Sequence, residues 1–176
     1  MCSLRTQAYV FDPRPHYPLL VPVKRYWVPE FESTDPNAVT LILAHALSFT
    51  KEHWEPLIKD LYDQLAITPR DSSSTSIPKI RDVWAIECPN HGEGAVLNEE
   101  TLLDGYTPAC TCLPPTFAKT ALNLIAETRS VTWEEYARAV HLVLNGLGKG
   151  INVDFKSRNL VGVGHSMGAS ALSVSH

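Results

Sequence analysis

The chain has 176 residues, of which 44% are hydrophobic and 19% are charged, and its formal net charge is -4 at pH 7. This length is typical of one domain with its own core. An acidic balance without a long basic run argues against nucleic acid as a partner. No apolar run approaches the roughly 18 residues that a membrane helix needs. Prolines and an aspartate break the N-terminal segment, which does not fit a signal peptide.

These features predict an intracellular protein. Cys110 and Cys112 form a C-x-C, whereas Cys2 and Cys88 stand alone. This spacing differs from that of zinc ligands, and thiols of intracellular proteins are normally reduced. We therefore expect no metal, no cofactor and no membrane span.

Residues 1–22 contain four prolines and are predicted to form an irregular N-terminal arm. Residues 23–176 are expected to be the N-terminal part of a single domain. Its first segment, residues 23–31, has the composition of a strand but includes Pro29. Proline cannot donate to a β-ladder, so we expect this strand at the edge of the sheet.

The next elements alternate between strands and helices. Residues 38–45 are a continuous apolar run, typical of a strand buried on both faces of a parallel sheet. Residues 50–66 have helical apolar spacing, with Thr50 as the predicted N-cap. A serine-rich surface connection over residues 67–79 is expected to follow.

The second half of the chain continues the alternation. The predicted elements are a strand (81–89), an irregular segment (90–118), helices (116–128 and 132–148), a strand (159–163) and the start of another helix. Thr132 and Glu135 form a capping box for the 132–148 helix, which Gly146 or Gly148 ends. This order predicts the α/β class, a mostly parallel sheet with flanking helices.

The segment "VGVGHSMGASAL" (161–172) places Ser166 between Gly164 and Gly168, directly after an apolar strand. A serine in a sharp strand-to-helix turn is held outward with a positive φ, and glycines two residues away avoid a clash. The N–H groups of the following helix point toward charge that develops near the serine. The pattern therefore predicts a nucleophilic serine.

Three separated segments resemble the α/β-hydrolase family. They are "VGHSMG" (163–168), similar to the nucleophile elbow, "LILAHALSFTKEHWEPLI" (41–58), similar to the strand-3 motif, and "DVWAIECPNHGEGAVLN" (82–98), similar to the strand-4 segment. The "KEHWEPLI" and "PNHGEGAVLN" stretches look most like a fungal branch with peroxisomal lipases and toxin-biosynthesis hydrolases. The resemblance implies the N-terminal portion of an α/β-hydrolase fold, truncated after the nucleophile elbow.

By this resemblance Ser166 is the catalytic nucleophile and the N–H of Met167 is one oxyanion-hole donor. The N–H of Leu47 is the other donor, although Ala46 stands where the family usually has glycine. His45 and His91 occupy positions whose usual role is to hold loop backbone near the site. His165 is expected to pack, because neighbouring side chains at a strand end point in opposite directions.

In the family the acid and the histidine of the triad follow the serine. Only "MGASALSVSH" follows Ser166, and His176 lies in or just past a helix that leads away from it. We therefore expect this chain to lack the triad acid and histidine, and to have no substantial esterase activity by itself.

The leading hypothesis is a serine hydrolase of carboxylic esters that forms an acyl-enzyme on Ser166, with a small-molecule ester or acyl compound as substrate. Thioesterase, peptidase and acyltransferase activities remain open. The alternative is a truncated hydrolase remnant or binding module without catalysis. A nucleotide-binding domain is disfavoured, because the glycine-rich stretch 146–152 follows a helix where a phosphate loop would follow a strand.

Overall fold

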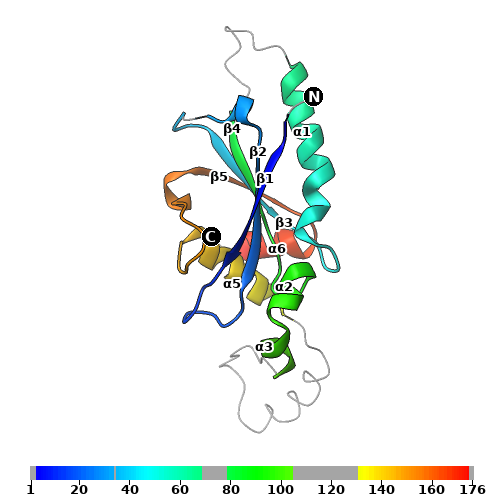
Figure 1. The fold of residues 1–176 in the computed structure, drawn as a ribbon, viewed down its shortest axis with the longest axis vertical. Helices are drawn as coiled ribbons and strands as arrows, with labels where there is room; N and C mark the ends of the chain where they lie inside the picture. The colour runs from blue at the N-terminus through cyan, green and yellow to red at the C-terminus, as the bar shows by residue number, and fades with distance from the viewer. Residues whose placement is uncertain (1–2, 34, 69–78, 105–130, 175–176) are drawn as a thin grey trace.

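A computed structural model describes residues 3–33, 35–68, 79–104 and 131–174. Its elements in chain order are β1 (Arg5–Phe11), β2 (Val21–Trp27), η1 (Pro29–Phe31), β3 (Val39–Ala44), η2 (Lys51–Trp54), α1 (Glu55–Ile67), β4 (Ile80–Ile86), α2 (Gly92–Leu97), α3 (Glu99–Leu103), α5 (Trp133–Leu144), η3 (Phe155–Ser157), β5 (Asn159–Gly164) and α6 (Met167–Val174) (Figure 1). Within these residues no helix combines the length and apolarity that a bilayer crossing requires.

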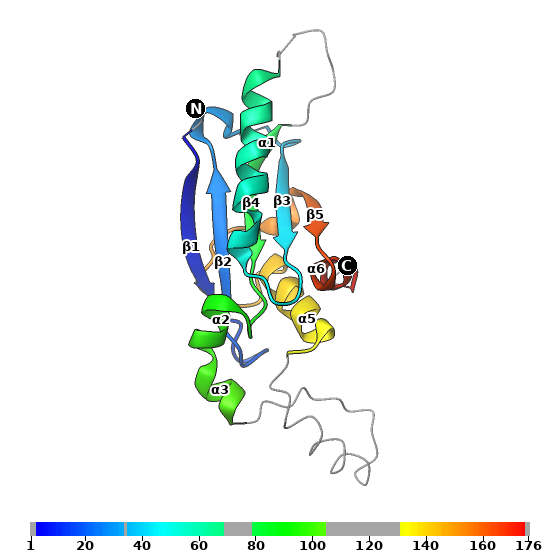
Figure 2. The ribbon, with the colours of Figure 1, turned by 90° about the vertical axis from the view of Figure 1, so that its right-hand side faces the viewer.

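The five strands form one sheet in the order β1-β2-β4-β3-β5. β3 pairs in parallel with both β4 and β5, whereas β2 is antiparallel to its neighbours β1 and β4. Figure 2 looks onto this sheet, with α1 lying across the near face. The predicted class, a mostly parallel sheet with flanking helices, is confirmed.

Two apolar clusters fill the two sides of the sheet. One packs Trp54, Ile58 and Tyr62 from η2 and α1 against strand residues such as Leu43 and Val83. The other packs α5 and α6 against the opposite face, with the large side chains Phe11, Trp84, Tyr136 and Phe155 fully buried. Burial of both faces explains why residues 38–45 form a continuous apolar run.

The irregular arm predicted over residues 1–22 is wrong for Arg5–Phe11, which forms the edge strand β1. Its prolines lie in the connection to β2 and at Pro22, outside β1. β2 is interior, which corrects the predicted edge position of residues 23–31. Pro29 does not interrupt the strand, because the strand ends at Trp27 and Pro29 begins η1.

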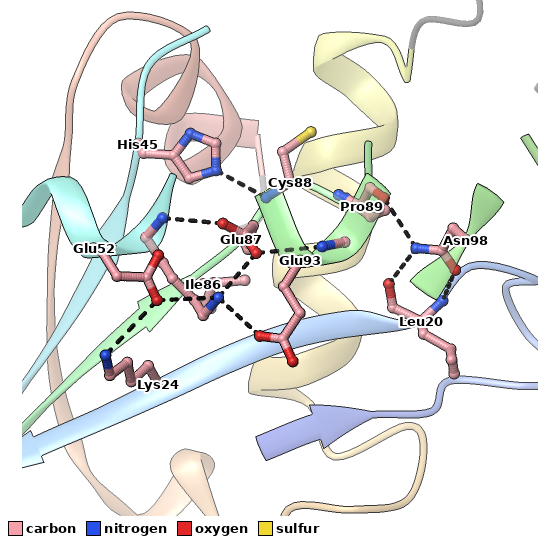
Figure 3. Close-up of polar contacts among 12 residues, drawn as sticks. Leu20, Lys24, His45, Glu52, Ile86, Glu87, Cys88, Pro89, Glu93 and Asn98 are labelled. Atoms are coloured by element: carbon pink, nitrogen blue, oxygen red, sulfur yellow. Dashed lines mark hydrogen bonds and ion pairs between the residues drawn. The ribbon is translucent and has the colours of Figure 1, made fainter. Parts of the chain in front are cut away.

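The segment 90–118 is not irregular throughout, since α2 and α3 lie within it. Asn98 between these helices is buried and hydrogen-bonds through Nδ2 and Oδ1 to the carbonyl and N–H of Leu20 (Figure 3). This tertiary contact stabilises two short helices, of which α2 contains two glycines that disfavour a helix. The rest of that segment, the predicted 116–128 helix and most of the 67–79 connection lie outside the described residues.

The 132–148 prediction is confirmed as α5, shortened at its C-terminal end. Thr132 caps it by accepting the N–H of Glu135 at 3.3 Å. Gly146 has φ 64°, and the N–H groups of Gly146 and Leu147 reach back to Val143 and Leu142, which is a Schellman ending. The 50–66 helix is also present, but Thr50 precedes the 3-10 turn η2 and its side chain makes no capping bond.

Candidate active site

Ser166 lies on the turn between β5 and α6, where the carboxyl ends of the parallel strands meet. β5 ends at Gly164 and α6 begins at Met167. Ser166 has φ 51°, a left-handed conformation that is uncommon outside glycine and is typical of nucleophile turns. The predicted sharp strand-to-helix turn is therefore confirmed, and the serine side chain is exposed.

Gly164 and Gly168 are required by close backbone packing at this turn. A Cβ on Gly164 would overlap the Cα and N of Ala169. A Cβ on Gly168 would overlap the carbonyl oxygen of Ala44 at the end of β3. Real Cβ atoms do not approach backbone so closely, so any larger residue would displace the turn. This is the physical reason for the glycines in the predicted pattern.

The strand predicted beside the serine is in place. β3 and β5 pair with Ala44 opposite Gly164, and the N–H of His165 donates to the carbonyl oxygen of Ala44 at 3.1 Å. Leu47 lies in the loop that follows β3 and is 56% exposed. The register therefore brings the loop with Leu47 to the same end of the sheet as Ser166. Its role as an oxyanion donor remains a prediction.

The N–H of Met167 opens the first turn of α6, directly after the serine. The N–H groups of Gly168, Ala169 and Ser170 already donate to the carbonyl oxygens of His165 and Ser166. The N–H of Met167 precedes them, while its side chain is buried and anchors the helix in the core. Helix N-termini favour negative charge, which suits Met167 N–H for the predicted oxyanion role.

His45 fixes the start of the loop after β3. Its Nε2 accepts the N–H of Cys88 at 3.0 Å, so its Nδ1 carries the proton and donates to the carbonyl oxygen of Ala46 at 2.8 Å. Burial lowers the pKa of His45 to about 4, which keeps the ring neutral. Both ring nitrogens are occupied, so His45 serves the loop backbone and is not free to act as a catalytic base.

Tyr136 of α5 was not predicted to take part, yet it anchors two strand ends. Its hydroxyl donates to the carbonyl oxygen of Ile86 at 2.7 Å and accepts the N–H of His45 at 3.2 Å. The residue is fully buried, and burial raises the pKa of its phenol well above the ordinary value. The sequence signal that could have identified Tyr136 is its position on the apolar face of an amphipathic helix. A tyrosine buried there needs a hydrogen-bond partner for its hydroxyl.

His91 joins the loop after β4 to the loop after β3. Its Nε2 accepts the N–H of Ser48 at 3.0 Å, and its Nδ1 lies 2.8 Å from Oδ1 of Asn90. Ser48 has φ 67°, so this bond holds an uncommon backbone conformation directly after Leu47. Burial lowers the pKa of His91 as well, which favours its neutral form.

His165 lies beside the serine but is exposed, which corrects the expectation that it packs inside. Its ring stacks on His53, with centroids 5.9 Å apart, and lies 6.0 Å from the ring of Phe49. The strand ends at Gly164, so the alternation of strand side chains no longer applies at this position. The three rings border the loop that carries Leu47.

In the described ranges, no group of three His, Cys, Asp or Glu side chains could hold a metal ion. Cys88 is buried, and burial raises the pKa of its thiol to about 12, so it is a poor nucleophile. Its Sγ lies 3.1 Å from Oδ1 of Asn90. Cys2, Cys110, Cys112 and His176 are outside the described residues.

The sheet order, the strained serine turn and the two supporting loops define a hydrolase architecture, and the family comparison agrees. The model of the alpha/beta hydrolase family matches residues 41–174. The chain therefore belongs to the alpha/beta hydrolase family.

Among curated proteins, two type I acyl-CoA thioesterases of Penicillium brevicompactum, mpaH' and mpaH, are each 26% identical to the chain over 156 residues. These matches cover 88% of the chain and 27% of each relative, so the chain spans about a quarter of their length. Among solved structures, the peroxisomal alpha-beta-hydrolase Lpx1 of Saccharomyces cerevisiae matches with a TM-score of 0.49 and 18% identity, over 95% of this chain and 38% of Lpx1.

Proposed function

We propose that the chain is the nucleophile-bearing part of a serine hydrolase that cleaves carboxylic esters through an acyl-enzyme on Ser166. The observation that supports this most directly is the φ of 51° at Ser166, held between Gly164 and Gly168 at the carboxyl end of the sheet. Such strain persists only where the surrounding structure maintains it, and it concentrates at functional sites.

In the proposed reaction the Ser166 hydroxyl attacks the substrate carbonyl carbon while a histidine base takes its proton. The negative charge that forms on the carbonyl oxygen is bound by the N–H groups of Leu47 and Met167. The carbonyl re-forms as the bond to the leaving alcohol breaks and the alcohol takes the proton. Water then cleaves the acyl-enzyme by the same route and releases the acid.

The base has to come from a histidine other than His45 and His91, whose ring nitrogens are engaged with Ala46, Cys88, Ser48 and Asn90. In the family the acid and histidine follow the serine, so we propose that both are encoded downstream of His176. Without them a serine hydrolase typically keeps only the acceleration from oxyanion donors and binding, about 10³–10⁴ over water.

Hydrolysis of acyl thioesters is the second candidate. It is favoured by one finding, the similarity of 88% of the chain to two curated proteins named acyl-CoA thioesterases. The same nucleophile and oxyanion donors serve both substrate classes, because a thioester differs only in the leaving group. An intracellular address, cytoplasmic or peroxisomal, belongs to the same proposal.

The test begins with the genomic sequence after codon 176, which we expect to encode an in-frame Asp or Glu and then a histidine. The protein encoded to the natural stop is expressed beside the 176-residue chain. Both are assayed with p-nitrophenyl esters and acyl-CoA thioesters, with folding checked by circular dichroism.

We expect turnover by the longer protein alone, and loss of about 10⁶-fold in kcat for Ser166→Ala, the typical cost of removing a triad nucleophile. Turnover that survives Ser166→Ala would refute the nucleophile assignment. A stop at codon 176 without activity would support the remnant alternative, and serine-dependent turnover by the 176-residue chain would place the base within it.

A further inference from the structure

Lys51 and Glu87 form a buried ion pair next to the loops that follow β3 and β4. The side chain of Lys51 is 3% exposed and that of Glu87 is fully buried, with Nζ 3.0 Å from Oε2. The backbone N–H of Lys51 also donates to Oε1 of Glu87 at 3.2 Å. Glu87 thus holds both the backbone and the side chain of one residue, which a simple charge contact would not do.

The pair is part of a larger charged cluster. Lys51 Nζ also lies 3.0 Å from Oε2 of Glu93 and 3.2 Å from Oε1 of Glu52, and the N–H of Gly94 points to Oε2 of Glu87 at 3.4 Å. Figure 3 shows Glu87 between the segments that carry Glu52 and Glu93, with His45 above it. Burial alone would lower the pKa of Lys51, but the hydrogen bonds of Glu87 and Glu93 raise it, so the lysine stays charged.

The position of this pair is what connects it to catalysis. Lys51 begins η2, directly after the loop that starts at His45, and Glu87 begins the loop that leads to His91. The same two loops are joined at Cys88 by His45 and at Ser48 by His91. The loop with Leu47 is therefore bound at its start, after its middle and at its end by the loop that follows β4.

Stability alone does not account for such a pair. The desolvation penalty of a buried ion pair offsets most of its attraction, so apolar replacements are often equally stable. The carboxylate of Glu87 accepts hydrogen bonds from the Lys51 side chain, the Lys51 backbone N–H and the Gly94 N–H. Because hydrogen bonds are directional, these contacts restrict where the two segments can lie. An oxyanion donor needs this restriction, because it must be in place before charge develops.

We propose that Lys51 and Glu87 are positioning residues that hold the Leu47–Ser48 segment so that the N–H of Leu47 faces the oxyanion. The proposal rests on the proposed function for the use of that N–H. Its structural part, the immobilisation of the segment, does not depend on catalysis and is measurable separately.

The first test is hydrogen–deuterium exchange at the Ser48 amide in the full protein. This N–H is exposed unless its bond to His91 persists, so its protection reports the junction of the two loops. We expect Glu87→Gln to raise the exchange rate of Ser48 at least about 10-fold relative to core amides such as Val83. Lys51→Arg keeps the charge and should retain protection close to that of the wild type.

Asp82→Asn is the matched control, because Asp82 lies on β4, which Glu87 directly follows, is equally buried and is paired with Arg25 and Arg158. It should lower overall stability and leave Ser48 protection relative to the core unchanged. Should Glu87→Gln not fold, Glu87→Asp, which keeps the charge and withdraws the carboxylate by one methylene, should show the same local effect. Unchanged relative protection in the folded Glu87 variants would overturn the proposal.

The second test is kinetic and uses the longer, catalytically competent protein. Glu87→Gln should lower kcat per folded molecule by about 10- to 100-fold with little change in KM, because a misplaced donor costs up to about 10²–10³. A local exchange effect with unchanged kcat would overturn the positioning role. Activity that survives Ser166→Ala would instead refute the proposed function, while the exchange result would stand.

Discussion

A fully buried carboxylate lies near each end of β4, and the two have different kinds of partner. Asp82 near the start accepts from Arg25 at 2.8 Å, Arg158 at 3.1 Å and Thr40 at 2.8 Å. Glu87, directly after the strand, is bound by Lys51 and Gly94.

The partners of Asp82 belong to β2, β3 and the residue before β5, so this carboxylate connects strands that already pair with one another. The partners of Glu87 belong to η2 and α2, which follow the two loops and lie outside the β-ladder. A buried carboxylate therefore stabilises strand pairing at the Asp82 end of β4. At the Glu87 end it holds segments that no strand pairing orders. Substitutions of Asp82 should lower the free energy of unfolding. Substitutions of Glu87 should mainly change the position of the Leu47–Ser48 segment.

The largest effect on stability is expected from Gly168→Ala, at the carboxyl end of the parallel strands. Its Cβ would overlap the Ala44 carbonyl oxygen, so the start of α6 must move away from β3. We expect a loss of about 4 kcal/mol or more in the free energy of unfolding, the range of severe backbone clashes.

Gly146→Ala is the matched control for Gly168→Ala. It has a positive φ of 64° but nothing within 4 Å of the added Cβ, so about 1–2 kcal/mol is expected from backbone strain alone. Urea unfolding of both variants measures the difference. Equal costs would mean that contact with β3 does not shape the serine turn.

Asp82→Asn is expected to cost about 3 kcal/mol, the lower end of the range for breaking a buried ion pair. The lower end applies because Arg25 and Arg158 are 20% and 17% exposed and keep some contact with water. Denaturant unfolding measures the loss. A cost equal to that of an exposed pair such as Lys59–Asp63, tested by Asp63→Asn, would contradict the reinforcing role of Asp82.

Acid should destabilise the protein through His45. Burial lowers its pKa from 6.5 to about 4. Between these two pH values the imidazole is protonated in the unfolded chain and neutral in the folded chain. Stability from the neutral ring is complete above pH 6.5 and is lost as pH falls toward 4. The total loss is about 3 kcal/mol.

The measurement is the free energy of unfolding from about pH 7 to about pH 4 for the wild type and for His45→Asn. The variant should show a flatter dependence, because asparagine does not titrate in this range. His91, whose pKa burial also lowers, adds a change of the same sign in both proteins. Parallel curves for the two proteins would show that His45 is not held neutral.

The smallest effect is expected from Thr132→Ala, which removes the cap of α5. Loss of the bond to the Glu135 N–H should cost about 1 kcal/mol, typical of an N-cap. Because α5 also carries Tyr136, which binds His45 and Ile86, thermal unfolding and the Ser48 exchange rate should both be measured. We expect the melting temperature to drop while the Ser48 amide exchanges no faster. Faster exchange at Ser48 would show that the cap of α5 also affects the loops.

Features with local causes could be predicted from the amino-acid sequence. The turn at Ser166 was predictable because the glycines that permit it stand two residues to either side. The apolar run of residues 38–45 predicted an interior strand, since burial on both faces leaves a continuous signal. Thr132 and Glu135 marked the start of α5 because a capping box is a bond between neighbours in sequence.

Features that depend on distant partners emerged only from the folded chain. β1 is a strand because residues 21–27 lie beside it, and the proline-rich connection between them conceals this pairing. Lys51 looks like one of the surface charges of an amphipathic helix, yet Glu87, 36 residues away, meets it in the interior. A buried charge requires an opposite charge, and which residue supplies it depends on the packing of loops that no local pattern encodes.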